Sequence, residues 1–282
     1  MAPAPLPSLT LAGPGRAGRA LARSWVAGGG RLDQVLARSE SAARAAASEL
    51  GAARSGALGE SEFDSAVLVI AVPDDALAPV AELLAGRGRA RFAIHLSGAR
   101  AADEIAALAR SGAEIASLHP LRAFRGAPDE TIRGAFVAVE GAPSACDAAE
   151  RFTLAMGADP HRISREAKPL YHAGATLAAG GVVALLSAAV RAWALAGLPQ
   201  EGAREALSAL AAEAVAGAAR TPFELALTGP LARRDLGTIG AHRRALEGHP
   251  DLLELYALLA AETLARTPGR GNEEEIRALF AC

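Results

Sequence analysis

The chain has 282 residues, a formal net charge of −2, and a composition that is 51 % hydrophobic but only 4 % aromatic. This length is sufficient for two domains with sizeable cores, here built mainly from Ala, Leu and Val. The near-neutral charge gives no electrostatic case for nucleic acid or an anionic membrane surface as a partner. Cys146 and Cys282 show neither metal-site nor disulfide-framework spacing, and the N-terminus lacks a signal-peptide pattern. We therefore expect a cytoplasmic protein without a bound metal.

The first half of the chain alternates apolar runs with Ala-rich helical stretches. Strands are predicted at 8–13, 34–38, 65–72, 91–98, 113–120 and 135–141, and helices at 15–27, 40–50 and 101–110. Continuous apolar strands alternating with helices are typical of a mostly parallel sheet covered on both faces. We predict an α/β domain over residues 1–150.

The strand pattern ends after about residue 165. Helices are predicted at 169–197, 201–219, 222–228 and 250–266, with a more ambiguous segment at 235–247. We interpret residues 151–282 as an all-helical domain. Residues 173–190 carry no charge, but this stretch is short and rich in Ala and Gly, so we expect a buried helix and no membrane span.

A glycine pattern lies between the first predicted strand and the first predicted helix. Gly13, Gly15 and Gly18 fit G-x-G-x-x-G, in which the first glycine permits a tight turn and the second lets the backbone approach a pyrophosphate. The phosphate then lies against free N–H groups at the helix N-terminus. The pattern in this context predicts a Rossmann-type dinucleotide site rather than a purely structural turn. The candidate residues are Gly13, Pro14, Gly15, Arg16, Ala17 and Gly18.

The end of the second predicted strand bears on which dinucleotide binds. An NAD site normally places an acidic residue there to hold the ribose, whereas this chain has Arg38 and Ser39 followed by Glu40. Arg38 can meet a 2′-phosphate with charge and donors, and Ser39 can add a hydrogen bond. We predict NADP, with NAD as the alternative if Arg38 is only a solvated charge and Glu40 holds the free 2′-hydroxyl.

Further candidates follow other strands, where ligands of open α/β sheets bind. Val72 and Pro73 are predicted to line the cofactor, as is Ser97 in "HLSGA". Asp74 and Asp75 are interpreted as helix-capping residues rather than catalytic acids. His119, in "SLHPL", is either a structural histidine or a functional group.

Lys168 is the only lysine among 29 basic residues, so the other 28 are arginines. Arginine stays protonated, whereas a desolvated lysine can work as an acid or base. If a helix starts at Pro169, then His172 and Thr176 follow Lys168 along one face at successive turns. We predict a catalytic role for Lys168 and His172 and a substrate-binding role for Thr176; the alternative is that a single lysine fell here by chance.

Six segments in order resemble the bacterial Rossmann-like family whose helical half is domain of unknown function 2520. They are "LAGPGRAG", "VIAVPDDAL", "HLSGA", "SLHPLRAF", "KPLYHAGATLAAG" and "LTGPLARRDLGTIGAHRRAL". The family is similar to 6-phosphogluconate and 3-hydroxyacid dehydrogenases, pyrroline-5-carboxylate reductase and prephenate dehydrogenase. The resemblance covers about residues 8–265.

The resemblance implies several roles. Hydroxyacid dehydrogenases use a Lys and an Asn one helical turn apart, a spacing that Lys168 and His172 match with His in place of Asn. The His119-Pro120 pair is similar to a prephenate dehydrogenase motif whose His contacts substrate. The signature at 229–242 implies that Arg233, Arg234 and His242 bind substrate, and the family often has Gly at the position of Arg234.

We therefore expect an NADP-dependent oxidoreductase that moves hydride between nicotinamide and a small carbonyl, imine or hydroxy-acid substrate. Lys168 would exchange a proton with the substrate heteroatom, while His172 and His119 position it. The alternatives are a non-catalytic dinucleotide sensor or regulatory protein, and a structural dimer that merely keeps the glycine turn. The apolar helices of the second half predict a homodimer.

Overall fold

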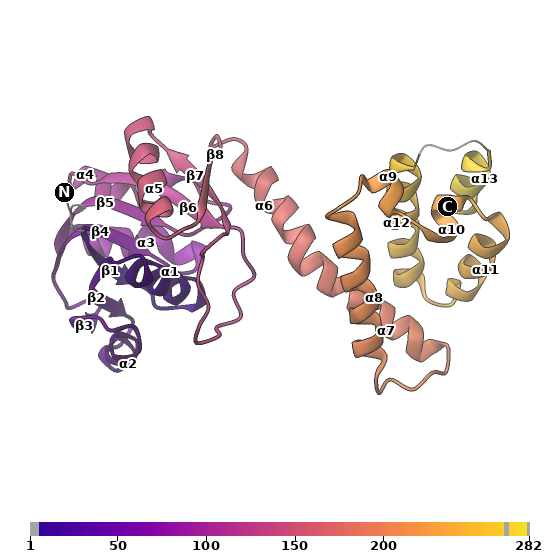
Figure 1. The fold of residues 1–282 in the computed structure, drawn as a ribbon, viewed down its shortest axis with the longest axis horizontal. Coiled ribbons are helices and arrows are strands. Elements are labelled where there is room, and N and C mark those ends of the chain that lie inside the picture. Colours follow the sequence, from indigo (N-terminus) through magenta and orange to yellow (C-terminus); the bar gives the residue numbers. More distant parts are fainter. Residues whose placement is uncertain (1–5, 268–270, 281–282) are drawn as a thin grey trace. The chain divides into compact units, whose positions relative to one another are not determined.

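The computed structural model describes residues 6–267 and 271–280, which divide into two compact units (Figure 1). The first unit runs to Ala179 and the second starts at Gly180. Each unit is described by itself below.

The first unit is built on an eight-stranded sheet of order β3-β2-β1-β4-β5-β6-β7-β8. Its strands are β1 (Ser8–Ala12), β2 (Arg31–Ala37), β3 (Arg54–Ala57), β4 (Phe63–Ile70), β5 (Gly88–His95), β6 (Glu114–Pro120), β7 (Phe136–Gly141) and β8 (Asp159–Arg162). Neighbouring strands are parallel except β6 and β7, which are antiparallel. The order reverses between β1 and β4, and ligands of such sheets bind where the order reverses, beyond the carboxyl ends of the strands.

Helices cover both faces of this sheet. They are α1 (Arg16–Ala27), α2 (Glu40–Leu50), α3 (Leu77–Ala85), α4 (Ala106–Arg110) and α5 (Pro143–Ala155). One core cluster joins α1, α2 and α5 to the strands, and in it the ring centroids of Trp25 and Phe152 lie 4.7 Å apart with the rings tilted by 32°. A second cluster joins α3 and α4 to the sheet. Burying each Leu or Val of these clusters contributes roughly 1.5–3 kcal/mol, which holds the strand ends rigidly in place.

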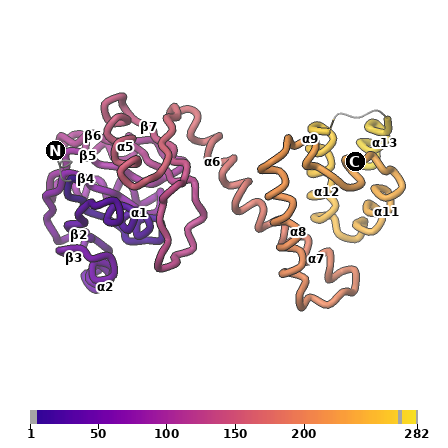
Figure 2. Tube along the Cα trace, viewed as in Figure 1, coloured from indigo at the N-terminus to yellow at the C-terminus, as the bar shows by residue number. Residues whose placement is uncertain are grey.

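The trace in Figure 2 shows the chain leaving β8 and entering α6 (Lys168–Thr176). A π-helical turn, Leu177–Gly181, and α7 (Val182–Leu195) continue α6 without a break. The second unit adds α8 (Ala203–Ala218), α9 (Phe223–Ala226), α10 (Gly229–Arg233), α11 (Leu236–Leu246), α12 (Pro250–Arg266) and α13 (Glu273–Leu279). Ile239, Leu264 and Ile276 form a small buried cluster that joins α11, α12 and α13.

These elements confirm the predicted fold class, a Rossmann-type mostly parallel sheet followed by helices. The first unit nevertheless extends to Ala179 rather than ending at residue 150, because α5 and β8 pack onto the sheet and α6 begins against it. The edge strands β3 and β8 were not predicted. Each has four residues, mostly polar or exposed, and therefore shows no apolar run.

The expectation of a buried helix at 173–190 was wrong for the isolated chain. Helix Lys168–Leu195 is long and apolar enough to cross a membrane by length and composition alone, yet only 6 % of its most apolar window is buried. Leu177 is 73 % exposed and Val183 is 66 % exposed. This helix therefore presents an apolar surface that the described parts of the chain leave largely uncovered.

Candidate functional site

The three glycines of the turn between β1 and α1 differ in how much room their surroundings would leave for a Cβ atom. Gly13 has φ +89°, and a Cβ there would lie 2.6 Å from the carbonyl oxygen of Ala71. A Cβ on Gly18 would lie 2.7 Å from the carbonyl oxygen of Gly13. At Gly15 the nearest atom would be 3.9 Å away, so packing inside the protein does not require glycine there. The bare backbone at Gly15 instead leaves room for a ligand to approach.

Helix α1 begins without a side-chain cap. Gly15 is its N-cap residue, and no side chain among the described residues caps its first N–H groups. The twelve-residue helix thus presents free donors and the positive end of its dipole beside the bare backbone of Gly15. This arrangement fits the pyrophosphate of a dinucleotide.

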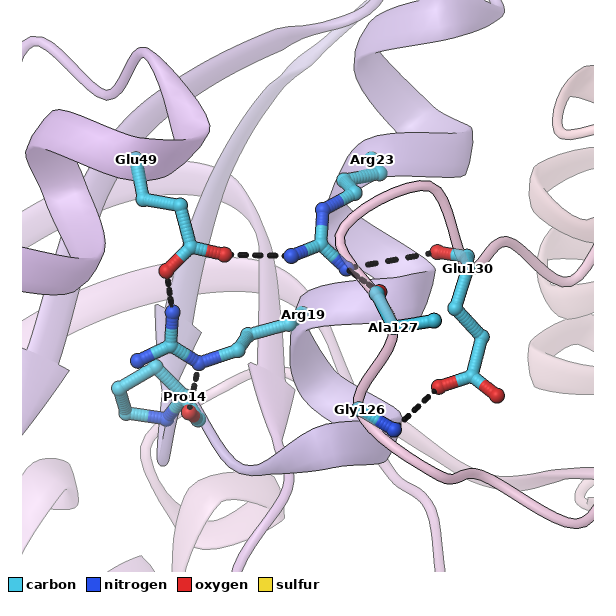
Figure 3. A network of polar contacts seen from close by, with 7 residues as sticks. All are labelled: Pro14, Arg19, Arg23, Glu49, Gly126, Ala127 and Glu130. Atoms are coloured by element: carbon cyan, nitrogen blue, oxygen red, sulfur yellow. Dashed lines mark hydrogen bonds and ion pairs between the residues drawn. The ribbon is translucent and has the colours of Figure 1, made fainter.

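A chain of polar contacts fixes the glycine turn to the β6–β7 loop, residues 121–135 (Figure 3). Arg19 donates from Nε to the carbonyl of Pro14 at 2.8 Å, and Arg19 and Arg23 both pair with Glu49. Arg23 also donates to the carbonyl of Ala127 at 3.2 Å. The loop is thereby held beside α1 at the same edge of the sheet as the glycine turn.

Glu130 organises the β6–β7 loop from within. Its carboxylate accepts hydrogen bonds from the backbone N–H of Arg125 at 3.0 Å and of Gly126 at 2.8 Å. These two bonds hold the pKa of Glu130 below its usual range. Gly126 in turn lies against the side chain of Arg16, the first residue of α1.

The end of β2 places Arg38, Ser39 and Glu40 as the sequence predicts, but with distinct roles. Ser39 caps α2 by accepting from the N–H of Ala42 at 3.3 Å, and Glu40 pairs with Arg44 on the next turn at 2.6 Å. Arg38 is exposed and forms no ion pair with any residue that the structure describes. Arg38 is therefore the group at this position that remains available to a 2′-phosphate.

The loops after β4 and β5 complete this edge of the sheet. Val72 contacts the position of Gly13, and Asp74 lies in the first turn of the short helix that precedes α3. Ser97 is buried, and its Oγ accepts from the N–H of Ala99 at 3.2 Å and of Arg100 at 3.0 Å. The predicted cofactor residues of β4 and β5 thus share the edge of the sheet with the glycine turn.

Lys168, the first residue of α6, is fully buried against β5 and β6. Its Nζ donates to Ser117 Oγ at 2.5 Å and to the carbonyl of Ser97 at 3.3 Å. Burial lowers the pKa of Lys168 to about 8, and the carboxylates of Glu140 and Asp74 oppose that shift. The amine is therefore mainly protonated at neutral pH but can lose its proton far more readily than an exposed lysine.

Next to this amine lie His119, Tyr171 and His172, all partly exposed. The phenol of Tyr171 and Nδ1 of His119 share a hydrogen bond of 2.9 Å, and the His119 and His172 rings meet edge to face 5.5 Å apart. Gly98 permits this contact, because a Cβ there would lie 2.3 Å from Nδ1 of His172. That Nδ1 is buried without a hydrogen-bond partner among the described residues.

Low pKa values keep His119 and His95 neutral at physiological pH. Burial lowers the pKa of His119 to about 4, and the charges of His172 and Lys168 add to the effect. Burial likewise lowers the pKa of His95 to about 4. His95 is structural: its Nε2 lies 2.9 Å from the carbonyl of Ala101, and its Nδ1 accepts from the N–H of Ser97 at 3.2 Å.

The structure brings Lys168, His172 and His119 together as the sequence predicts, with all three in the first unit. Thr176 lies further along α6, where its hydroxyl donates to the carbonyl of His172 at 2.9 Å. Tyr171 and Ser117 were not singled out from the sequence. The sequence does give one indication of a role for Tyr171, because it is one of only two tyrosines and is adjacent to His172.

Arg233, Arg234 and His242 belong to the second unit. Arg234 is buried in the left-handed conformation with φ +55°, and its Nη2 donates to the carbonyl of Thr267 at 2.7 Å. The tight turn that a glycine would form here is therefore kept, and the arginine side chain ties α10 to the end of α12. Arg233 is exposed, and His242 shares a 2.9 Å hydrogen bond with Tyr256.

Comparison with known proteins agrees with this architecture. A Rossmann-like domain model matches residues 4–120, and the model of domain of unknown function 2520 matches residues 135–263. The two models match successive parts of the chain, a Rossmann-like part followed by a part similar to domain 2520. The comparison with curated proteins finds no match.

Solved structures with this fold include enzymes that use nicotinamide dinucleotides. The chain is 23 % identical to Thermotoga maritima protein TM1727, with a TM-score of 0.73 and coverage of 96 % of this chain and 98 % of the other. It is 17 % identical to an imine reductase from Myxococcus stipitatus in complex with NADP⁺, with a TM-score of 0.61 and coverage of 98 % and 100 %. It is 12 % identical to the Plasmodium falciparum pyrroline carboxylate reductase with NADP bound, with a TM-score of 0.59 and coverage of 98 % of each chain. At these identities the likeness shows the fold.

Proposed function

We propose that this protein is an NADP-dependent oxidoreductase acting on a small carbonyl, imine or hydroxy-acid substrate. One observation carries the proposal: the buried amine of Lys168 and the His119–Tyr171 pair lie at the same edge of the sheet as the glycine turn. Titratable groups with shifted pKa values at a ligand-binding edge are typical of catalytic sites. The NADP-bound imine reductase and pyrroline carboxylate reductase, which share the fold, support the cofactor class.

The cofactor would bind through three parts of the first unit. The N-terminus of α1 and the bare backbone of Gly15 hold the pyrophosphate, and Arg38 holds the 2′-phosphate. Val72 and Pro73 line the loop after β4, beside Gly13. When bound, the nicotinamide ring supplies or accepts the hydride.

The polar cluster would orient the substrate and stabilise charge that develops on its heteroatom. His119, Tyr171 and His172 are partly exposed and can contact a ligand, whereas Lys168 has its amine enclosed and bonded to protein atoms. Its positive charge acts at short range in surroundings of low dielectric constant. The direct exchange of a proton between Lys168 and substrate stays a prediction.

The enclosure of Lys168 also favours a second candidate, a dinucleotide-binding sensor without catalysis. A buried lysine that donates to Ser117 and Ser97 can serve the fold alone. Titration with NADPH and NADH, followed by an assay of NADPH oxidation with a panel of carbonyls and imines, separates the two. Binding with turnover supports the enzyme, binding without turnover supports the sensor, and a failure to bind either dinucleotide contradicts both.

The uncovered apolar helix supports a further part of the proposal, a homodimer. Single chains rarely leave large contiguous apolar patches exposed. Length and composition alone do not decide between lipid and protein, since the helix is long and apolar enough to cross a membrane. The helix begins with Lys168 buried against the sheet, and α7 packs along α8. A second copy of this chain therefore fits the exposed surface better than lipid does.

A further inference from the structure

The polar groups around Lys168 differ in their accessibility to a bound molecule. Lys168 and Ser117 are completely buried, and each hydrogen-bonds to protein atoms. His119, Tyr171 and His172 are partly exposed. Only the second group can touch a bound molecule without rearrangement, so the residue that exchanges a proton with the substrate must come from it.

His119 is poorly suited to donate that proton. Because burial, His172 and Lys168 lower its pKa to about 4, only about one molecule in a thousand carries the imidazolium at pH 7. The neutral ring does offer one N–H that can donate a hydrogen bond and one nitrogen that can accept one. In the structure, the nitrogen nearest the phenol of Tyr171 is Nδ1, at 2.9 Å.

Tyr171 has the properties that His119 lacks. Burial raises the pKa of Tyr171, so its phenol keeps its proton throughout the neutral range. Its ring meets the His119 ring edge to face at 5.6 Å and also lies near Phe136, which restricts the side chain. The phenol thus has a defined position and a proton to give, and in the tautomer with the proton on Nδ1 His119 donates to the phenolic oxygen and leaves that proton free.

We propose that Tyr171 is the catalytic acid of this protein and that His119 positions its phenol. The proposal rests on the oxidoreductase function proposed above. As hydride from the reduced cofactor reaches the substrate carbon, the π electron pair moves to the nitrogen or oxygen and forms a bond to the phenolic proton. The phenolate left behind recovers a proton from water. Lys168 is a positioning residue whose charge adds to the burial that keeps His119 neutral.

The test compares substrates that differ only in their need for a proton. Reduction of a neutral cyclic imine requires one, whereas its N-methylated iminium salt already carries the positive charge and requires none. Tyr171→Phe removes the phenolic oxygen alone. We expect kcat for neutral imines to fall by about 100-fold or more, the usual effect of losing a general acid. We expect the N-methylated salts to be reduced within about threefold of the wild-type rate and NADPH affinity to change less than threefold.

A matched variant controls for lost stability. Tyr256 makes the same kind of bond, with His242 Nδ1 at 2.9 Å, in the second unit. Thermal denaturation of Tyr256→Phe therefore gives the stability effect of removing a Tyr–His hydrogen bond. Tyr171→Phe activity that equals wild type on neutral imines, or that is lost equally on both substrate classes, would overturn the assignment to Tyr171. A wild-type protein that binds NADPH yet oxidises it neither with these imines nor with the panel of carbonyls would overturn the proposed function itself.

Discussion

Lys168 Nζ lies 2.5 Å from Ser117 Oγ, so the single lysine of the chain joins the first turn of α6 to strand β6. The contact spans 51 positions of sequence and is completely buried. It places Tyr171 and His172, which follow Lys168 on the same helix, against His119 at the end of β6. The amine therefore helps to hold Tyr171 and His172 against His119.

Replacing Lys168 with methionine should remove activity and also change how stability depends on pH. Burial lowers the folded pKa of Lys168 to about 8 from 10.5, so the unfolded chain binds its proton more tightly. Stability from this group therefore rises with pH between about 8 and 10.5, and below about 8 the buried charge costs roughly 3 kcal/mol. We expect the unfolding free energy of wild type, relative to Lys168→Met, to rise over that window in urea titrations. A constant difference from pH 7 to 10 would contradict the buried amine.

Replacing Arg38 with alanine should change the choice of cofactor rather than the ability to bind one. If Arg38 meets the 2′-phosphate, its loss removes charge-assisted hydrogen bonds that contribute about 1.5–3 kcal/mol, or roughly 10- to 100-fold in affinity for NADPH. NADH lacks that phosphate, and its affinity should stay within about twofold. Arg44→Ala is a matched control, because Arg44 is also exposed but pairs with Glu40. Equal losses of affinity for NADPH and NADH would show that Arg38 does not contact the 2′-phosphate.

The sequence identifies those parts of the site that depend on local backbone geometry. The glycines of the turn are predictable because each lies at a fixed offset between a strand and a helix, and Gly13 and Gly18 lie where a Cβ would clash. Lys168 is predictable because it is rare in this chain. The apolar runs of β1 and β4 likewise give the central sheet, since buried parallel strands need no alternation.

Other features depend on contacts between distant segments and leave no local pattern. Ser117 is one serine among many until α6 places Lys168 against it. The pairing of Tyr171 with His119 joins residues 52 positions apart. The exposure of helix 168–195 is likewise invisible in its composition, because an apolar sequence predicts burial but does not specify against what. The left-handed conformation of Arg234 runs against the preference of its residue type and follows from the turn between α10 and α11.

The three glycines of the turn should respond differently to alanine. Gly13→Ala places a Cβ 2.6 Å from a carbonyl oxygen in a left-handed backbone, so we expect a loss of about 2 kcal/mol or more in stability. Gly15→Ala should leave stability within about 1 kcal/mol of wild type, because its backbone suits any residue and its surroundings are open. The Gly15→Ala substitution should nevertheless weaken the binding of both NADPH and NADH by about tenfold or more. Thermal denaturation and fluorescence titration of the two variants test this contrast, and unchanged binding by Gly15→Ala would argue against a pyrophosphate at the turn.

Glu130 should make the β6–β7 loop sensitive to acid. The hydrogen bonds from Arg125 and Gly126 lower its pKa, so its contribution is complete above the ordinary carboxyl pKa of 4.5 and is lost as the pH falls through the lower folded value. We expect the protection of the Gly126 amide against hydrogen exchange to decrease over that acidic range. Glu130→Gln should reduce this protection at neutral pH and abolish its acid dependence. A Gly126 amide equally protected in both proteins would show that other contacts, such as that from Arg23 to Ala127, hold the loop alone.

The apolar surface of helix 168–195 gives the last prediction. If a second copy covers it, the wild-type protein should sediment as a dimer, and Val183→Asp should shift it to a monomer, because burying an uncompensated carboxylate at an interface is strongly unfavourable. Leu154→Asp is a matched control, since Leu154 is 61 % exposed on α5 in the first unit and should leave the dimer intact. Analytical ultracentrifugation of the three proteins measures the difference. A wild-type monomer in solution, or wild-type protein recovered with membranes and released only by detergent, would show that a different partner covers this helix.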